Sequence, residues 1–293
     1  TRIVAVLSIG CFLQITCERL LQSTGKTLLS MFSQMAGAII NLILDPIMIF
    51  GWFGCPRMEV AGAATATVIG QIAAACIGIL LNRHWNHEIH LSLRDILHPE
   101  KETIGKIYYV SVPSILMVSI GSVMTYLMNL ILMGFSSTAT AVFGAYFKLQ
   151  SFFFMPVFGL NNGMIPVLAY NYGAGKGQRI KEALVFAVKV ALFVMIIGTL
   201  VMQLAPRPLL QLFHASDHMM SLGIPALRII SLHFPIAAAS IVFSAAFQAF
   251  SRSFYALVVS VARQLGVLIP VAYILSLTGD VNKIWFSFVI AES

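Results

Sequence analysis

Residues 182–205 read EALVFAVKVALFVMIIGTLVMQLA, and this stretch decides the fold class. Only Glu182 and Lys189 carry a charge in it. A helix needs about 20 predominantly apolar residues to cross the hydrocarbon core of a bilayer, and this stretch is long enough. Because a helix satisfies its backbone hydrogen bonds internally, the stretch predicts a transmembrane helix.

The whole chain has the composition of a membrane protein. Of its 293 residues, 59% are hydrophobic and 10% are charged, whereas a soluble domain has roughly 25% charged residues. These few charged residues cannot cover the surface of a soluble globular protein. Lipid must therefore cover much of the surface of this chain. We therefore predict an all-α membrane protein, a polytopic helical bundle. The predicted spans are residues 3–22, 30–52, 62–82, 105–134, 140–170, 182–205, 220–250, 255–277 and 283–293.

Every second connection between these spans is rich in Lys and Arg. The connections after spans one, three, five and seven hold Lys26; Arg83, Arg94, Lys101 and Lys106; Lys176, Arg179 and Lys181; and Arg252. The alternate connections hold Arg57, Arg207 and Lys283. Lys and Arg collect on the cytoplasmic side, so the rich set is predicted to be cytoplasmic in a multi-pass protein of the cell (inner or plasma) membrane. This topology explains the net charge of +7 without nucleic-acid binding.

One long polar connection, residues 83–104, is predicted to be a cytoplasmic linker between two lobes. A solvated linker is favoured there over a metal site, although the segment is rich in histidine. The histidines are His84, His87, His90 and His98. The cysteines form no CxxC pair, so no metal site is predicted from them either. They are Cys11, Cys17, Cys55 and Cys76.

A weak internal repeat relates the two ends of the chain. At one common offset the sequence pairs Arg2-Ile-Val4 with Arg228-Ile-Ile230, Gln22 with Gln248, Lys26 with Arg252, and Thr27 with Ser253. Residues 67–71 (TVIGQ) also match residues 288–292 (FVIAE). Spans one to three therefore resemble spans seven to nine. This predicts two pseudo-symmetric six-helix lobes, related by an axis along the membrane normal.

Two complete lobes need three more helices before Thr1, or roughly 120 residues at the usual length of a span and its loop. We therefore expect the chain to hold helices 4–12, the last one truncated. Residues 1–82 are then the second half of the N-lobe, residues 83–104 the linker, and residues 105–293 the C-lobe.

An acid within a predicted span is the sharpest candidate for function, because ionisable groups in lipid are costly and usually functional. Residues 41–46 read NLILDP. Asn41 and Asp45 are four residues apart and share one helix face, and Pro46 frees a backbone carbonyl nearby. These hard oxygens suit a small cation, or the carboxylate can take a proton. An Asp that only caps a broken helix is the alternative. The repeat favours function, because residues 267–271 (VLIPV) contain no acid.

The predicted span 140–170 carries several polar groups beside residues that bend helices. They make this span a candidate wall of a substrate cavity, and Pro156 and Pro166 allow it to bend. Lys148 is also explained by snorkelling to a membrane surface. Arg263, within about two turns of the cytoplasmic end of span eight, has the same two explanations. The cavity candidates are Lys148, Gln150, Asn161 and Asn162.

Several stretches together resemble one family, the multidrug and toxic compound extrusion (MATE) transporters. They are residues 22–26 (QSTGK), 41–50 (NLILDPIMIF), 60–71 (VAGAATATVIGQ), 154–161 (FMPVFGLN) and 171–176 (NYGAGK). The remaining spans fit in length and order. The family has twelve helices in two lobes, which agrees with the repeat.

The resemblance implies a cation site. In many bacterial and archaeal members the N-lobe site uses an acid on helix one, an Asn and an Asp on helix five, and a Thr on helix six. Asn41 and Asp45 match the helix-five pair, and Thr67 is matched to helix six, with Thr65 as the alternative. The helix-one acid would precede Thr1. Some members also use acids on helices seven and ten, but residues 106–134 and 221–250 contain no Asp or Glu, so no C-lobe Na⁺ site is expected.

The function that the resemblance implies is antiport: H⁺ or Na⁺ enters while organic cations or amphiphilic drugs leave, through rocking lobes. No cofactor is expected beyond the coupling ion, and a monomer is implied. A lipid-linked-precursor flippase is the first rival, although it would need a more cationic cavity. An enzyme is not expected, because the spans hold no cluster of His, Asp or Glu. A channel or a structural assembly would not explain the lone, lobe-specific Asp45.

Overall fold

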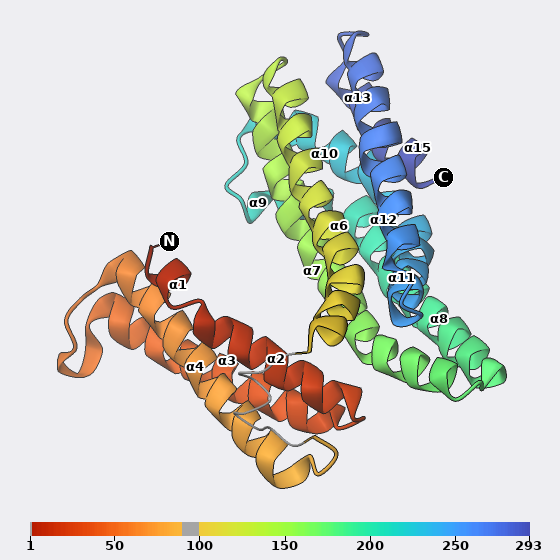
Figure 1. Ribbon diagram of the computed structural model, residues 1–293. Coiled ribbons are helices and arrows are strands. Elements are labelled where there is room, and N and C mark those ends of the chain that lie inside the picture. Colours follow the sequence, from red (N-terminus) through yellow and green to blue (C-terminus); the bar gives the residue numbers. More distant parts are fainter. Residues whose placement is uncertain (1, 90–99) are drawn as a thin grey trace. The chain divides into compact units, whose positions relative to one another are not determined.

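The computed structural model describes residues 2–89 and 100–293, and within them the regular structure is entirely helical (Figure 1). The all-α prediction is confirmed. In chain order the helices of the first part are α1 (Arg2–Val6), α2 (Ile9–Ser23), α3 (Thr27–Phe50), the short 3₁₀ turn η1 (Trp52–Gly54) and α4 (Glu59–Trp85). Those of the second part are α6 (Lys101–Met133), α7 (Ser137–Gly173), α8 (Gly177–Leu204), α9 (Pro206–Gln211), α10 (Asp217–Ser231), α11 (Phe234–Ala249), α12 (Ser253–Val261), the π-helical stretch η2 (Ala262–Leu268), α13 (Ile269–Ser276), α14 (Val281–Ile284) and α15 (Phe286–Glu292).

Within the described residues, six helices are long and apolar enough to cross a membrane. They are α3, α4, α6, α7, α8 and the continuous run from α12 to α13. A seventh crossing forms if α10 and α11, which meet at 50°, count as one broken span. The chain is therefore a multi-pass membrane protein. The predicted first span is interrupted between α1 and α2, and the predicted last one between α14 and α15.

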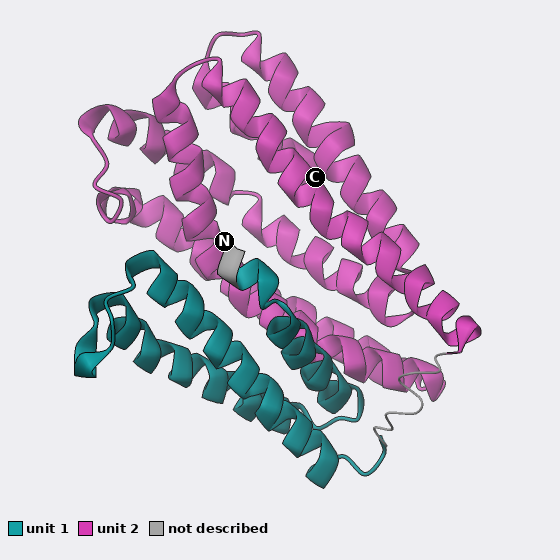
Figure 2. Cartoon of the chain, turned by 60° about the vertical axis from the view of Figure 1, so that its left-hand side comes forward, with its two compact units in different colours: residues 1–99 teal, residues 100–293 magenta. Residues whose placement is uncertain are grey.

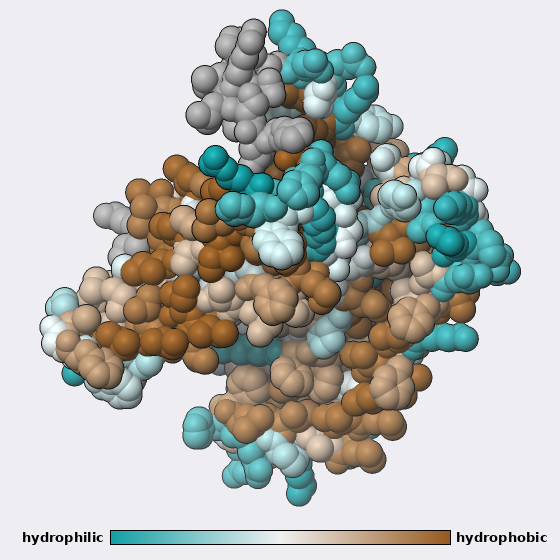
Figure 3. All heavy atoms as spheres, turned by 90° about the horizontal axis from the view of Figure 1, so that it is seen from below, coloured by the Kyte–Doolittle hydropathy of each residue, from teal (hydrophilic) through white to brown (hydrophobic). Residues whose placement is uncertain are grey.

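Large apolar side chains cover much of the surface, as a lipid environment requires. Phe53 is 90% exposed, Val60 83% and Leu204 81%. Figure 3 shows one face on which hydrophobic residues, in brown, spread widely while hydrophilic residues gather in patches. Contiguous apolar surface of this extent marks an interaction with another phase or partner, and here the bilayer covers it.

The chain divides into two compact units (Figure 2): unit 1 is Thr1–Pro99 and unit 2 is Glu100–Ser293. The predicted linker, residues 83–104, is partly helical, since α4 continues to Trp85 and α6 begins at Lys101. Its residues 90–99, with His90 and His98, lie outside the described residues. The division into lobes stays a prediction.

Unit 1 is held together by small residues where α3 crosses α4. A Cβ added at Gly70 would lie 2.8 Å from the Gly37 carbonyl oxygen, and one added at Gly62 would lie 2.4 Å from the Met48 carbonyl oxygen. The two backbones are thus in contact without intervening side chains. Ser33 adds a 2.8 Å hydrogen bond from its hydroxyl to the Ala74 carbonyl. Small residues at close crossings are typical of helix pairs in membranes.

Unit 2 packs around the long helix α7. Helix α8 lies against both α7 and α11, and α6 lies against α12. Aromatic side chains fill the centre: the ring of Phe143 stacks at 6.3 Å on Trp285, and both residues are almost fully buried. Burial of rings this large dominates the packing of a core.

At the break between α10 and α11, side chains donate hydrogen bonds to backbone carbonyls. Pro235 has no N–H, so the Ser231 carbonyl lacks its usual helical donor. The Thr199 hydroxyl of α8 donates to that carbonyl at 3.1 Å. Nearby, Gln203 donates from Nε2 to the Arg228 carbonyl at 2.7 Å. A broken helix inside a membrane requires such partners.

Three connections share one turn geometry. A residue with positive φ ends the helix: Gly25 at 78°, Gly175 at 67° and Ser251 at 57°. The basic residue that follows donates its N–H to a carbonyl five residues back, from Lys26 to Leu21, from Lys176 to Asn171, and from Arg252 to Phe247. This is the Schellman pattern of helix ends. The first and third turns are the ones that the internal repeat pairs.

Candidate functional site

The close crossing of α3 and α4 positions a cluster in unit 1 around Asp45. Asn41 lies one helical turn before Asp45 on α3, and its Cβ would be 3.2 Å from a Cβ at Gly70 of α4. Thr67 lies one turn before Gly70, so it faces Asn41 across the crossing. The Asn41 Nδ2 atom lies 3.5 Å from Asp45 Oδ1 and 3.3 Å from Thr67 Oγ1. We call Asn41, Asp45 and Thr67 the carboxylate cluster.

The Asn41 amide contacts Asp45 in either of its two orientations. With oxygen and nitrogen exchanged, the nitrogen donates to Asp45 Oδ2 at 3.3 Å and the oxygen accepts from the Thr67 N–H at 3.1 Å. This second orientation satisfies both amide atoms, so it is preferred. The amide therefore ties the carboxylate of α3 to α4.

The carboxylate cluster is half-buried and offers oxygen atoms. Pro46 lies inside α3 and leaves the Leu42 carbonyl without its helical donor, one turn from Asp45. No group of three or more His, Cys, Asp or Glu side chains in the described residues is placed to hold a metal ion. One carboxylate among neutral oxygens suits a proton or a small hard cation rather than a transition metal.

Of the two threonines considered for the site, the structure brings Thr67 to Asn41. The Thr65 hydroxyl donates to the Ala61 carbonyl at 2.8 Å and has no bond to the carboxylate cluster. Thr67 makes the same kind of bond to Ala63 and contacts Asn41 in addition. The role of these residues as a cation site stays a prediction.

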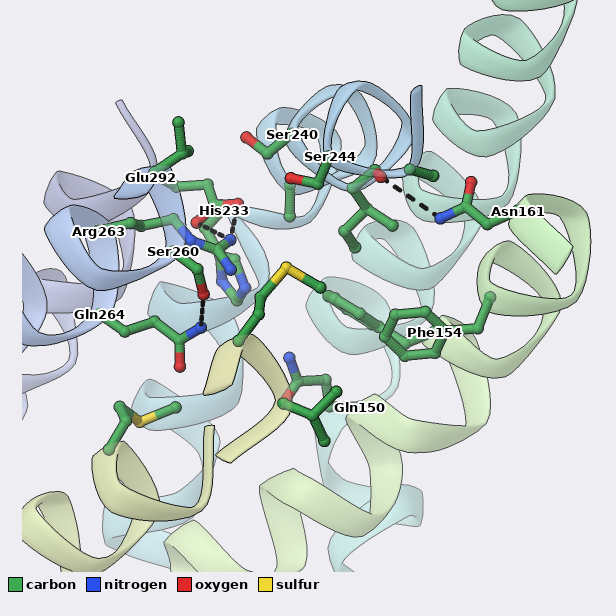
Figure 4. Close-up of a pocket in the computed structure, with 18 of the residues that line it drawn as sticks. Gln150, Phe154, Asn161, His233, Ser240, Ser244, Ser260, Arg263, Gln264 and Glu292 are labelled. Atoms are coloured by element: carbon green, nitrogen blue, oxygen red, sulfur yellow. Dashed lines mark hydrogen bonds and ion pairs between the residues drawn. The ribbon is translucent and has the colours of Figure 1, made fainter. Parts of the chain in front are cut away.

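A separate pocket of about 540 Å³ lies within unit 2. Helices α6, α7, α11, the α12–η2 run and α15 all contribute side chains to it (Figure 4). Its apolar wall includes Met117, Met124, Phe147, Phe154 and Phe158. Its polar wall includes Gln150, Asn161, Ser244, Ser260 and Gln264. An apolar cavity with a few convergent polar groups is the usual form of a small-molecule site.

Three of the four predicted cavity residues line this pocket: Gln150, Asn161 and Asn162. Asn161 donates from Nδ2 to the Ile241 carbonyl at 3.4 Å. The fourth, Lys148, does not line this pocket. It is exposed, with its ammonium 5.9 Å from the centre of the Phe213 ring. Lys148 and Gln150 are two residues apart, and therefore about 200° apart around the helix.

The pocket also contains Arg263, which the sequence offered as either a cavity residue or a snorkelling one, and Glu292 and His233, which the sequence did not assign to a cavity. Arg263 pairs with Glu292 of α15, and Nη1 lies 2.6 Å from Oε1 and 2.7 Å from Oε2. His233, at the break between α10 and α11, is buried, and its Nδ1 lies 2.5 Å from the Ile230 carbonyl oxygen. The match of residues 288–292 with residues 67–71 was the available signal, because it places Glu292 where the first repeat has Gln71.

The π-helical stretch η2 carries Arg263 and Gln264 into the pocket. Gln264 donates from Nε2 to the Ser260 hydroxyl at 3.0 Å. A π-helix has more than four residues per turn, so its side chains point in directions that a regular α-helix would not give them. Such stretches occur frequently at functional sites.

The family profile MatE matches residues 113–274, more than half of the chain. The chain belongs to the MatE family. The resemblance found in the sequence is thereby confirmed. Among curated relatives, the multidrug export protein MepA of Staphylococcus haemolyticus is 30% identical over 278 residues, which cover 94% of this chain and 60% of that protein. An FAD transporter of Shewanella oneidensis is 30% identical over 258 residues, covering 86% of this chain and 56% of that protein.

A solved structure agrees with this membership at the level of fold. It is the outward-facing conformation of a multidrug resistance MATE family transporter of the MOP superfamily, with a TM-score of 0.88 and 23% identity. The similarity covers 99% of this chain and 65% of the solved one. This MatE chain therefore spans about 60% of the length of the relatives it matches. The relatives named here are transporters and not enzymes.

Proposed function

We propose that the protein is a cation-coupled antiporter that exports organic cations or amphiphilic drugs, with H⁺ or Na⁺ as the coupling ion. The observation that carries this proposal is the carboxylate cluster. Asp45 of α3 contacts the Asn41 amide, which in turn contacts Thr67 of α4, and both helices are long enough to cross a membrane. A carboxylate within a helix of spanning length is costly and usually functional.

The names of the relatives support export of small molecules. Several are multidrug export proteins and one is an FAD transporter. These names favour drug export over the flipping of lipid-linked precursors.

In the proposed mechanism two lobes rock so that a central cavity opens to one side of the membrane and then to the other. Binding of H⁺ or Na⁺ at Asp45 neutralises a charge between α3 and α4. This favours the conformer in which the helix pair excludes water, and the drug binds the other conformer better. Coupling requires only that each ligand prefer a different state.

The test uses the full-length protein in proteoliposomes. Efflux of a fluorescent organic cation is followed under an imposed pH gradient and then under a Na⁺ gradient. Asp45→Asn keeps the shape of the side chain and removes its exchangeable charge. Glu102→Gln is the matched control, because Glu102 is 80% exposed in a surface pair with Lys106, and such pairs contribute little.

We expect gradient-driven export by the wild type and by Glu102→Gln, and its loss in Asp45→Asn. The gradient that drives the wild type identifies the ion. Undiminished export in Asp45→Asn would contradict the assignment of the coupling site. Export by the wild type with no gradient dependence would contradict antiport itself.

A further inference from the structure

The ion pair between Arg263 and Glu292 uses only part of the arginine. Both contacts come from Nη1, at 2.6 and 2.7 Å from the two carboxylate oxygens. A guanidinium has five N–H donors in a rigid fork. Within the described residues, Nε and Nη2 of Arg263 have no acceptor. The edge formed by Nε and Nη2 can pair with a carboxylate through two parallel hydrogen bonds.

The two members of the pair differ in their access to the pocket. The Glu292 side chain is 5% exposed, whereas that of Arg263 is 28% exposed. Figure 4 shows Arg263 extending toward His233, with Ser260 and Gln264 beside it. A molecule that enters the pocket therefore reaches the arginine before it reaches the glutamate.

The charges of the pocket favour an acceptor ligand at this place. Apart from this pair, the pocket lining holds no Asp, Glu or Lys and no second Arg, and His233 is its only other titratable side chain. Glu292, the only carboxylate, is already bound to Arg263. Among the described residues, the pocket therefore presents the Nε and Nη2 donors of one arginine and no unpaired acid. An organic cation finds no counter-charge here, whereas an acid finds donors.

The opposite wall is suited to a flat ring. Phe154 and Phe158 have ring centres 6.3 Å apart and tilted, and Met117 and Met124 face the same space. Aromatic and methionine side chains adapt to varied planar ligands. A cavity of about 540 Å³ is within the range of drug-sized sites.

We propose that the unit 2 pocket binds an aromatic carboxylate, with the acid group on the Nε–Nη2 edge of Arg263 and the ring against Phe154 and the methionines. Glu292 fixes the guanidinium from the opposite side. Because Glu292 also offsets the positive charge, the anchor acts mainly through directional hydrogen bonds. This inference rests on the proposed export function and names a substrate class for it, acids and zwitterions beside organic cations.

The experiment measures binding rather than transport, so its failure is distinguishable from failure of the antiport proposal. Full-length protein in nanodiscs is titrated into 9-anthracenecarboxylate and, separately, into the neutral 9-anthracenemethanol. Fluorescence anisotropy gives a Kd for each probe. The ratio of the two Kd values reports the contribution of the acid group and cancels effects of pocket shape.

Three variants test the anchor. The double variant Arg263→Gln with Glu292→Gln removes both charges and avoids leaving either one buried without a partner. Glu292→Gln alone keeps the arginine and removes its competitor. Glu102→Gln is the control, because Glu102 lies in an exposed surface pair with Lys106, and wild-type affinity is expected for both probes.

We expect the wild type to bind the carboxylate about tenfold more tightly than the alcohol, the scale of a charge-assisted pair. The double variant should lose this preference and still bind the alcohol within about twofold of the wild type. Glu292→Gln should raise the preference. A preference that is absent in the wild type, or one that survives in the double variant, would overturn the assignment.

Discussion

Thr65 and Thr67 form a natural matched pair for a test at the scale of single residues. Each hydroxyl donates to the carbonyl four residues earlier at 2.8 Å, Thr65 to Ala61 and Thr67 to Ala63. Thr67 alone lies 3.3 Å from the Asn41 amide. Substitution by valine therefore removes the same local bond at both positions, but it removes a member of the carboxylate cluster at only one.

We predict that Thr67→Val raises the concentration of coupling ion needed for half-maximal export by about fivefold to tenfold, because it removes one oxygen ligand worth about 1 kcal/mol from the carboxylate cluster. The Thr67 backbone N–H that binds the Asn41 oxygen is kept. Thr65→Val should stay within about twofold of the wild type. Initial export rates in proteoliposomes at graded ion concentrations measure both. Equal effects of the two substitutions would mean that Thr67 acts only through its helix.

The limits of sequence reasoning at this scale follow from helix geometry. Asn41 and Asp45 could be paired from their spacing alone, because residues four apart share a face. Thr67 could not be separated from Thr65 in the same way, since the sequence does not say which face of α4 meets α3. For the same reason, the sequence did not show that Lys148 and Gln150 point away from opposite faces of α7. The sequence left Arg263 between a cavity and a membrane surface, because the direction of its side chain depends on a π-helix.

At the scale of elements, Gly70 couples helix packing to the carboxylate cluster. A Cβ at this position would lie 2.8 Å from the Gly37 carbonyl oxygen and 3.2 Å from the Asn41 Cβ. The first neighbour is backbone, so α3 itself must move. Crowding of this kind typically costs about 1–3 kcal/mol. The displacement also takes Asn41 away from Thr67.

We predict that Gly70→Ala lowers the thermal unfolding temperature of the detergent-solubilised protein and weakens gradient-driven export. Gly159→Ala in α7 is the control, because nothing lies within 4 Å of a Cβ there. Alanine is favoured over glycine in a helix by about 1 kcal/mol, so the control should be as stable as the wild type or more so. If Gly70→Ala left both stability and export unchanged, the close crossing would not matter.

The positions of the elements were largely predictable, and their interruptions were less so. The span predicted at 182–205 corresponds to α8 at Gly177–Leu204, because apolar length alone defines it. The predicted span 220–250 contains the break before Phe234, which Pro235 marks in the sequence. The interruption between α1 and α2 has no such marker. Its presence depends on packing rather than on local propensity.

At the scale of the whole molecule, the alternation of basic residues supported the predicted order of spans, whereas the described residues hold six helices of spanning length, or seven with the broken pair. The structure adds independent support for the repeat through its turns, since Gly25 and Ser251 both adopt positive φ and precede a basic residue. Positive φ costs Ser roughly 1–2 kcal/mol, whereas Gly has no such cost. The second turn therefore keeps the geometry of the first, although it has Ser251 where the first has Gly25. The assignment of the units to lobes depends on the helices that the repeat predicts before Thr1, and it stays a prediction.

The same alternation makes a prediction about sides of the membrane. Cys55 is exposed between η1 and α4, in a connection whose basic residue is Arg57. Gln178 is exposed at the start of α8, beside Lys176 and Arg179. Basic residues favour the cytoplasm, so Cys55 should face outward and Gln178 inward.

The measurement is labelling with a membrane-impermeant maleimide in intact cells and in inverted vesicles. One protein keeps Cys55 and replaces the other three cysteines by alanine; the second also carries Cys55→Ser and Gln178→Cys. We predict labelling of the first in cells and of the second in inverted vesicles. The two sites are separated by α4, α6 and α7, three helices of spanning length, and an odd number of crossings requires opposite sides. Labelling of both proteins from the same side would mean that one of these helices does not cross. The cytoplasmic assignment of Lys26, Lys176 and Arg252 would then lose its basis, because it rests on the same count.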